Sequence, residues 1–213
     1  MIELKDICFA YDSEPVLNYF SMCVKDGETV VLQGENGCGK STVLGILNGL
    51  LFAEKGTYIF SGEEITEKKM KSQAFSKAFH KKIGYVFQNT ELQLFCSSVQ
   101  EEIAFGPMQM GFDEQEIQKR VDDMLEFLNI EKLRDRAPYR LSCGEKKKVA
   151  IASVLAVNPE VLILDEPFNF LDKASRIWLT EFLKSMKAAG KTIIIVTHSD
   201  ELVQELDARV IRM

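Results

Sequence analysis

The residues with the most definite chemistry form a glycine-rich loop at positions 34–42. Its sequence, Gly-Glu-Asn-Gly-Cys-Gly-Lys-Ser-Thr, fits the pattern G-x-x-x-x-G-K-[ST] at every fixed position. The apolar run 29–32 before it is typical of a strand, and the apolar spacing after it is typical of a helix. Glycines let backbone N–H groups and a helix N-terminus converge on an anion. The segment therefore predicts a phosphate-binding loop.

Within this loop the side chains have distinct expected roles. Lys40 is expected to reach the β- and γ-phosphates of a nucleotide. Ser41 is expected to ligate Mg²⁺, a cation bound mainly through substrate phosphates and few protein oxygens. The predicted nucleotide contacts in the loop are Gly34, Asn36, Gly37, Cys38, Gly39, Lys40, Ser41 and Thr42. A glycine-rich turn without a ligand is the alternative, which the strand, loop and helix context disfavours.

A second candidate group follows an apolar strand at 161–165. Asp165 ends this strand and is expected to hold Mg²⁺ through water. Glu166, one residue later, is the candidate general base for an attacking water molecule. Glu166 could instead be a structural carboxylate that caps the following loop, and Pro167 is compatible with either role.

A third candidate segment is Leu141-Ser142-Cys143-Gly144-Glu145, directly before a basic helix start. It follows a loop and opens a helix, so its exposed N–H groups favour a phosphate for the same reason as the first loop does. A phosphate loop alone predicts only that a nucleotide is bound. An L-S-x-G element ahead of a strand that ends in Asp-Glu adds a second phosphate-binding segment and a candidate general base, which indicates more than nucleotide binding.

Three single residues gain meaning from their positions. Gln88 and His198 each follow an apolar strand, and the carboxyl ends of strands are the usual ligand side of open α/β sheets. Tyr11 is an aromatic residue upstream of the loop that could stack on adenine. Taken alone, Gln88 is more typical of a surface residue, His198 of a histidine with hydrogen-bond partners in the core, and Tyr11 of a turn residue. Their order in this chain favours the nucleotide site.

The elements that must position these residues alternate along the chain. Strands are expected at 2–7, 16–24, 28–33, 56–60, 83–87, 161–165 and 192–197. Helices are expected within 98–135, after Leu141, and at 173–187 and 199–206, and the stretch 64–82 is expected to be a solvated helix or loop. Strands that are apolar at successive positions are covered on both faces, which indicates an α/β fold with a parallel sheet flanked by helices.

Composition narrows the class of protein. With 213 residues and 46% hydrophobic content, the chain can bury one substantial core and fits one domain with lobes. A net charge of −6 argues against nucleic acid as the main partner. The five cysteines are scattered, which favours reduced thiols in the cytoplasm. No apolar run approaches the roughly 20 residues that cross a bilayer, so a soluble or peripheral protein is expected.

Together these motifs make the chain similar, throughout its length, to the nucleotide-binding subunits of ABC transporters. The match includes Tyr11, the loop 34–42, Gln88, the signature 141–145, Asp165-Glu166, Leu171-Asp172 of the D-loop, and His198. The resemblance implies a single nucleotide-binding domain over 1–213, with a phosphate-loop NTPase core, an N-terminal antiparallel β lobe and an inserted helical lobe at about 90–147. It also implies ATP and Mg²⁺ as ligands and ATP hydrolysis as the activity, with Glu166, His198 and Gln88 as catalytic residues and Ser41, Gln88 and Asp165 at the metal.

Within this family, the chain looks most like the ATPases of energy-coupling-factor importers of the cobalt and nickel type. Four short strings carry this narrower match: 86–89, 93–95, 104–106 and 146–152. It implies a subunit that powers import of cobalt, nickel or a vitamin. The implied partners are an integral membrane coupling subunit and a substrate-binding membrane subunit, at the cytoplasmic face of the cell membrane. The family's substrate pocket lies in another polypeptide, so this sequence does not name the cargo.

The resemblance also implies a mechanism in two subunits, either a homodimer or a heterodimer with a related ATPase. Ser142 and the Gly144 backbone of one chain would complete the γ-phosphate site of the other, with Asp172 near the shared nucleotide. The helical lobe would carry the motion to the membrane subunit. Glu101 and Glu102 are expected to be exposed there, either as contacts for basic coupling helices or as a solvated helix face.

Departures from the family pattern bear on these expectations. Cys143 and Glu145 stand where the usual L-S-G-G-Q has glycine and glutamine, and Phe168-Asn169-Phe170 has two rings where small residues are common. These changes, together with an end at Met213 that lacks the extension common in relatives, leave a degenerate half of a heterodimer possible. The alternative functions are a soluble ABC-type ATPase outside transport and a kinase of small metabolites. The kinase would leave the signature and His198 unexplained.

Overall fold

The computed structural model describes residues 1–213 and divides them into two compact units. The first unit comprises Met1–His80 and Phe182–Met213, and the second comprises Lys81–Glu181. No helix in the chain combines the length and the apolar character that crossing a membrane requires.

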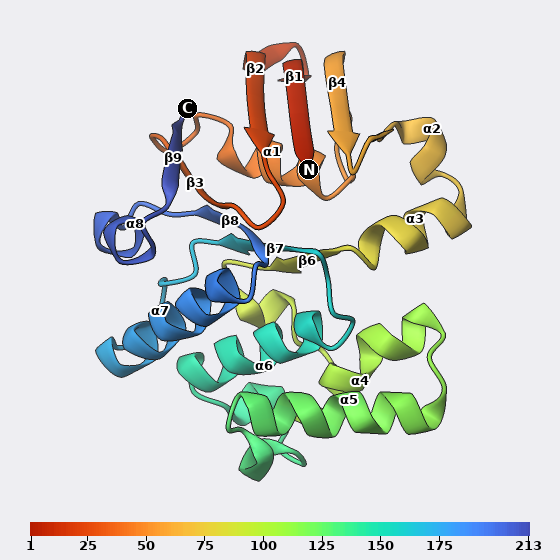
Figure 1. Ribbon diagram of the computed structural model, residues 1–213, viewed down its shortest axis with the longest axis vertical. Coiled ribbons are helices and arrows are strands. Elements are labelled where there is room, and N and C mark those ends of the chain that lie inside the picture. The colour runs from red at the N-terminus through yellow and green to blue at the C-terminus, as the bar shows by residue number, and fades with distance from the viewer. The chain divides into compact units, whose positions relative to one another are not determined.

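The first unit contains an antiparallel sheet in which β1 (Ile2–Tyr11) lies between β2 (Glu14–Val24) and β4 (Lys55–Phe60) (Figure 1). The short strand β5 (Glu63–Glu64) lies beyond β4. Ile2, Leu4 and Ile7 of β1 are buried. Apolar residues on one face of an antiparallel sheet form its core side, whereas the other face is polar. The predicted β lobe is therefore present, and its first strand is longer than the expected 2–7.

The same unit contains three parallel strands, with β3 (Thr29–Gln33) between β8 (Thr192–Val196) and β9 (Arg209–Arg212). Every residue of β8 is buried, as expected for a strand covered on both faces. Four helices accompany these strands: α1 (Lys40–Leu47), α2 (Glu67–Met70), α3 (Gln73–His80) and α8 (Asp200–Leu206). The polar stretch 64–82 is thus mainly helical, whereas β9 was not predicted.

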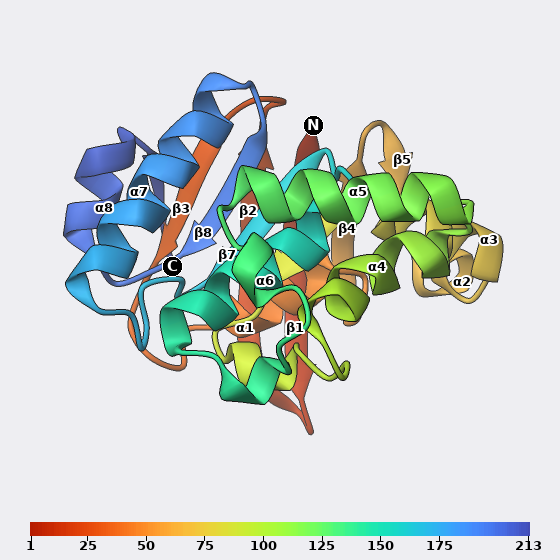
Figure 2. The ribbon, with the colours of Figure 1, turned by 90° about the horizontal axis from the view of Figure 1, so that it is seen from below.

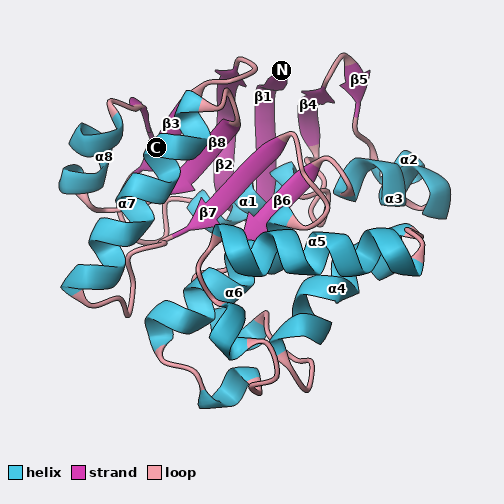
Figure 3. Ribbon diagram, turned by 60° about the horizontal axis from the view of Figure 1, so that its bottom comes forward, coloured by secondary structure: helices cyan, strands magenta, loops and turns pink.

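The second unit pairs β6 (Ile83–Val86) in parallel with β7 (Val161–Asp165), and the two strands lie side by side in Figure 3. Three helices pack together beside them: α4 (Val99–Met110), α5 (Glu114–Phe127) and α6 (Cys143–Leu155) (Figure 2). Short 3₁₀ turns lie between β6 and α4, namely η1 (Thr90–Leu92), and between α5 and α6, namely η2 (Glu131–Leu133) and η3 (Pro138–Arg140). Helix α7 (Lys173–Ala188) begins in this unit and ends in the first.

The helical pattern that the sequence predicts over 98–135 resolves into α4, α5 and η2. Val121 and Leu125 of α5 and Leu128 just after it are buried, so one apolar face of this helix belongs to the core. Side-chain caps mark the starts of these helices, because Ser98 accepts from the backbone N–H of Glu101 and Asp113 from that of Glu116. Such caps satisfy N–H groups that the first turn of a helix leaves unpaired.

Candidate nucleotide site

The phosphate loop in the first unit ends in a helix start that has no side-chain cap. Helix α1 begins at Lys40, and its N-cap, Gly39, has φ 101° and makes no side-chain cap hydrogen bond. By contrast, Ser98, Asp113, Ser142 and Ser199 cap α4, α5, α6 and α8. The first-turn N–H groups of α1 are therefore not taken by a capping side chain, which is what an anion-binding helix start requires.

The adenine-side residue predicted from the sequence lies on a hairpin that contacts this loop. A Cβ atom at Gly39 would lie 2.8 Å from Leu17 Cδ2 and 3.1 Å from Val16 Cγ1, so β2 packs directly against the loop. Tyr11 pairs with Glu14 at the end of the same hairpin and is 48% exposed. Its ring contacts Phe9 edge-on, with centroids 4.8 Å apart. An exposed aromatic face is therefore present next to the strand that touches the phosphate loop.

Lys40 already points into the loop. Its side chain is buried, and Nζ donates hydrogen bonds to the carbonyl oxygens of Gly34 and Glu35, both at 2.8 Å. The Cys38 sulfur lies 3.9 Å from the same nitrogen. The ammonium group is thus held inside the ring of backbone that the motif predicts for the phosphates.

Strand register places His198 at the same sheet edge as the loop. The parallel pair of β3 and β8 matches Leu32 with Val196. Gly34 and His198 each come two residues after this pair, so both lie just beyond the carboxyl ends of neighbouring strands. His198 is exposed. The first unit therefore places the phosphate loop and His198 at one sheet edge, and Tyr11 on the hairpin that touches the loop.

The second unit brings together the other strand-end residues. The parallel pair of β6 and β7 matches Val86 with Leu164, so Gln88 and Glu166 lie at one edge. The Tyr85 hydroxyl donates to Asp165 Oδ2 at 3.2 Å. Burial and the Asp165 charge both raise the pKa of Tyr85, so that its hydroxyl remains a donor near neutral pH. This bond fixes the orientation of the Asp165 carboxylate.

The backbone after Asp165 is strained at two positions. Glu166 has φ 40° and Phe170 has φ 64°, values that side chains with a Cβ atom rarely adopt. The Asn169 N–H donates to the Glu166 carbonyl at 3.1 Å, which closes a turn that starts at Glu166. Strained backbone is concentrated at functional sites, where the surrounding structure enforces it. The strain at Glu166 therefore supports its status as a site candidate.

The signature segment forms a complete capping box at the start of α6. The Ser142 N–H and hydroxyl both donate to Glu145 Oε2 at 2.8 Å, and the Glu145 N–H donates back to Ser142 Oγ at 3.3 Å. The backbone N–H of Ser142 is the main cause that lowers the pKa of Glu145. Glu145 stands where the family pattern has a neutral glutamine, and its negative charge is stabilised locally by the helix start.

Gly144 allows α6 to approach the start of α7 closely. A Cβ atom at Gly144 would lie 2.3 Å from Ser175 Oγ and 3.2 Å from Ser175 Cβ. The Ser175 N–H in turn donates to Asp172 Oδ1 at 2.7 Å. The predicted signature and D-loop residues are therefore linked through Ser175, which the sequence analysis did not identify.

One expectation about the helical lobe is wrong. Glu102 is 3% exposed, and its Oε2 accepts hydrogen bonds from the backbone N–H groups of Phe95, at 2.9 Å, and Cys96, at 2.8 Å. It folds back to cap the preceding loop because carboxylates in the first turn of a helix are stabilised by unpaired N–H groups. Glu101 is exposed, as expected, and accepts from the Ser97 hydroxyl at 2.6 Å.

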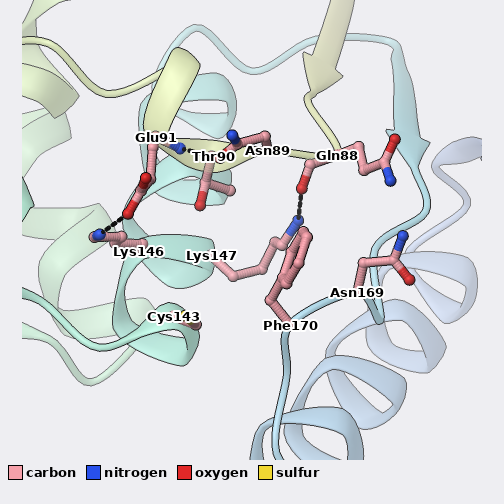
Figure 4. Close-up of a pocket in the computed structure, with 9 residues that line it drawn as sticks. All are labelled: Gln88, Asn89, Thr90, Glu91, Cys143, Lys146, Lys147, Asn169 and Phe170. Carbon is pink, nitrogen blue, oxygen red and sulfur yellow. Dashed lines mark hydrogen bonds and ion pairs between the residues drawn. The ribbon is translucent and has the colours of Figure 1, made fainter.

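A cavity of about 210 Å³ opens in the second unit near these segments (Figure 4). It is lined by Gln88, Asn89, Thr90, Glu91, Cys143, Lys146, Lys147, Asn169 and Phe170. The Phe170 ring is 72% exposed, whereas Lys147 is 2% exposed. Burial lowers the pKa of Lys147 to about 8, with the nearby Asp165 charge opposing this shift.

The sequence analysis assigned no role to Lys147, although the helical spacing of the sequence around it indicates that this residue is buried. Lys147 comes three and four residues before Ala150 and Ile151, which are both fully buried. Residues at this spacing share a helix face. A lysine on an apolar face is the pattern that marks a buried cation.

Comparisons with known proteins decide the family. The sequence profile of the family described as ABC transporter matches residues 17–169. The chain belongs to the ABC transporter family. It is therefore an ATPase of this family, which binds nucleotide and hydrolyses ATP in the service of transport.

Two relatives illustrate the likeness across nearly the whole chain. The nickel import ATP-binding protein LarO of Lactiplantibacillus plantarum is 44% identical over 211 residues, which cover 99% of this chain and 88% of LarO. The energy-coupling factor transporter ATP-binding protein EcfA of Methanothermobacter thermautotrophicus is 40% identical over 211 residues, which cover 99% of this chain and 67% of EcfA.

Solved structures agree with the fold. The cbiO1 protein of Clostridium perfringens, part of the ABC transporter complex cbiONQ, has a TM-score of 0.84 at 38% identity and covers 95% of this chain and 80% of its own. The dimeric ATP-binding cassette MJ0796, bound to ADP and Pi after hydrolysis, has a TM-score of 0.87 at 26% identity and covers 100% and 94%. The predicted phosphate-loop NTPase fold is confirmed, and ATPases of this family dimerise and work with membrane subunits.

Proposed function

We propose that this chain is the ATPase subunit of an energy-coupling-factor importer for Ni²⁺ or Co²⁺. The observation that carries the proposal is the 44% identity, over 99% of the chain, to a nickel import ATP-binding protein. The likeness to cbiO1, a subunit of the cbiONQ complex, points in the same direction. The chain would act at the cytoplasmic face of the membrane, bound to a coupling subunit and a substrate-binding subunit.

The residues present fit ATP and Mg²⁺. The α1 start has no side-chain cap, and Lys40 Nζ lies within the loop, so both provide donors for a triphosphate. The Ser41 hydroxyl of the first unit and the Asp165 carboxylate of the second, which Tyr85 orients, would offer the oxygen ligands that Mg²⁺ prefers. When bound, Mg²⁺ would neutralise charge on the phosphates. Glu166 would accept the proton of the attacking water, and Gln88 and His198 would orient that water and the γ-phosphate.

The signature would serve a second chain. In a head-to-tail pair, Ser142 and the Gly144 backbone of one chain would complete the γ-phosphate site of its partner, with Asp172 beside them. Support comes from the link between Gly144, Ser175 and Asp172, which holds both segments in one arrangement. The partner would be a second copy or a related ATPase.

An apolar surface on the helical lobe is the proposed contact for the membrane coupling subunit. Phe95 and Phe105 are 66% and 37% exposed, and their rings meet edge-on with centroids 4.9 Å apart. Met108 lies three residues after Phe105 on α4 and is 56% exposed. Glu101 lies four residues before Phe105 on the same helix. Apolar side chains beside one exposed carboxylate suit an amphipathic, basic helix.

The variant Phe95→Asp tests this surface. A carboxylate placed at the centre of an apolar contact loses its hydration when the partner binds, so we expect capture of the coupling subunit to fall at least tenfold. The measurement is a pull-down from detergent extracts of cells that express the neighbouring membrane proteins. Tyr19→Asp, at an aromatic residue of the first unit that is 63% exposed, is the matched control and should capture the subunit normally. Equal capture by both variants would remove this surface from the proposal.

Transport itself is tested by reconstitution. The purified ATPase and its membrane subunits are placed in lipid vesicles, and uptake of radioactive ⁶³Ni²⁺ or ⁵⁷Co²⁺ is measured with and without ATP. ATP-dependent uptake of either ion is the expected result. ATP hydrolysis without uptake of either ion would contradict the metal cargo and direct the search to vitamins, whereas no association with any membrane subunit would favour a soluble ATPase.

A further inference from the structure

Lys147 carries a positive charge on a helix face that is otherwise apolar and buried. It lies on the buried face of α6 and is 2% exposed. Its hydrogen bonds run to main-chain carbonyl oxygens, of Phe87 at 3.3 Å and Gln88 at 3.4 Å, and not to a carboxylate. Removing a lysine ammonium from water costs several kcal/mol. Two long hydrogen bonds to neutral groups and the nearby Asp165 charge do not fully offset this cost, since the pKa of Lys147 is still lowered. Lys147 is therefore a poor choice for stability alone.

The two carbonyls that Lys147 binds belong to the loop that carries Gln88. This loop leaves β6 after Val86, and residues 87–89 are exposed. In Figure 4 the Gln88 carbonyl points toward Lys147 Nζ, while its side-chain amide extends away from the lysine. Fixing the carbonyl thus holds the backbone from which the Gln88 side chain extends.

A second contact ties the same loop to the same helix. Lys146 forms an ion pair with Glu91 of η1, and its side chain is 11% exposed. The Asn89 side chain accepts from the Glu91 N–H at 3.0 Å, which closes the turn between the two anchored points. Residues 87–91 are therefore attached to the first two turns of α6, the helix that begins with the signature.

We propose that Lys147 is a positioning residue that attaches the Gln88 loop to the signature helix, so that Gln88 is held in its working orientation and follows α6. The proposal deepens the proposed function, because it concerns the same ATP site. The residue acts through Gln88 and does not itself need to touch the nucleotide. Its ammonium group is the only lysine terminus of the Lys146-Lys147-Lys148 run that binds the Phe87 and Gln88 carbonyls: Lys146 pairs with Glu91, and Lys148 lies 4.7 Å from the centre of the Trp178 ring.

The test compares Lys147→Met with the neighbouring control Lys148→Met. Methionine fills a similar volume but donates no hydrogen bond. We expect kcat for ATP to fall about tenfold, which corresponds to about 1.4 kcal/mol of transition-state stabilisation, with KM within about twofold of wild type. The thermal midpoint should stay the same or rise, because an apolar group replaces a buried cation. Lys148→Met should keep the wild-type kcat.

A second measurement does not depend on turnover. Hydrogen exchange of the backbone amides of residues 87–91 should become faster in Lys147→Met, while exchange in α1 stays unchanged. A lowered thermal midpoint or a misfolded variant would show that Lys147 is structural and overturn the proposal, as would unchanged kcat with unchanged exchange. If the wild-type complex hydrolysed no ATP, the proposed function would fail, and the exchange experiment would still decide whether Lys147 holds the loop.

Discussion

Replacing Glu166 by glutamine is expected to lower kcat for ATP hydrolysis at least a hundredfold while ATP still binds. Glutamine keeps the shape and the backbone strain at φ 40° but cannot accept a proton. General bases contribute about 10²- to 10⁴-fold to rate, and that contribution would be lost. With hydrolysis blocked, ATP should also trap a dimer, which size-exclusion chromatography with Mg-ATP would detect beside the phosphate-release assay.

The matched control for this variant is Glu160→Gln. Glu160 lies just before β7 in the same unit, with its side chain 56% exposed in an ion pair with Lys82, and its loss should leave kcat unchanged. The sequence left open that Glu166 merely caps the following loop. In that case Glu166→Gln would keep more than a tenth of wild-type turnover, and the chief effect would be a lower thermal midpoint.

Lys40→Ala is expected to act on binding and not on the chemical step alone. The ammonium group donates to the Gly34 and Glu35 carbonyls at 2.8 Å, so it is already placed within the loop. Charge-assisted hydrogen bonds contribute about 1.5–3 kcal/mol each, and losing two to the phosphates weakens ATP binding about a hundredfold or more. Isothermal titration with Mg-ATP measures this directly.

Lys55→Ala serves as the control for this binding experiment. Lys55 is an exposed lysine on β4 of the same unit, and its removal changes the net charge by the same amount. Its ATP affinity should stay within twofold of wild type. An affinity for Lys40→Ala within threefold of wild type would mean that the phosphates bind elsewhere. Protection by ATP against heat, which grows with ligand concentration over Kd, gives an independent reading of the same quantity.

The parts of this molecule that the sequence predicted are those governed by local pattern. The strands β3, β7 and β8 are apolar at almost every position because they are covered on both faces, so their ends could be located. Since paired parallel strands end at a common edge, the sequence placed the phosphate loop beside His198 in the first unit and Gln88 beside Glu166 in the second. Strand register therefore accounts for most of the candidate site residues in each of the two units.

The features that were missed depend on partners distant in the chain. Strand β9 has only four residues, with arginines at both ends, and it exists because β3 offers it a free edge. Glu102 is buried because the loop at 95–96 turns its N–H groups toward it. Lys147 is buried because the Gln88 loop folds over it. Periodicity could have marked Lys147 as facing the core, but composition and periodicity do not show which distant groups compensate a buried polar side chain.

The capping box at Ser142 changes how association of two chains should be understood. The Ser142 hydroxyl has one hydrogen, and Glu145 of the same chain already receives it. A γ-phosphate offered by a second chain would therefore compete with a built-in carboxylate for this donor, and closure becomes an exchange of one anion for another. The same carboxylate is ready to recover the hydroxyl once the phosphate leaves. In the proposed head-to-tail pair, Glu145 would therefore weaken binding of the second chain and speed its release.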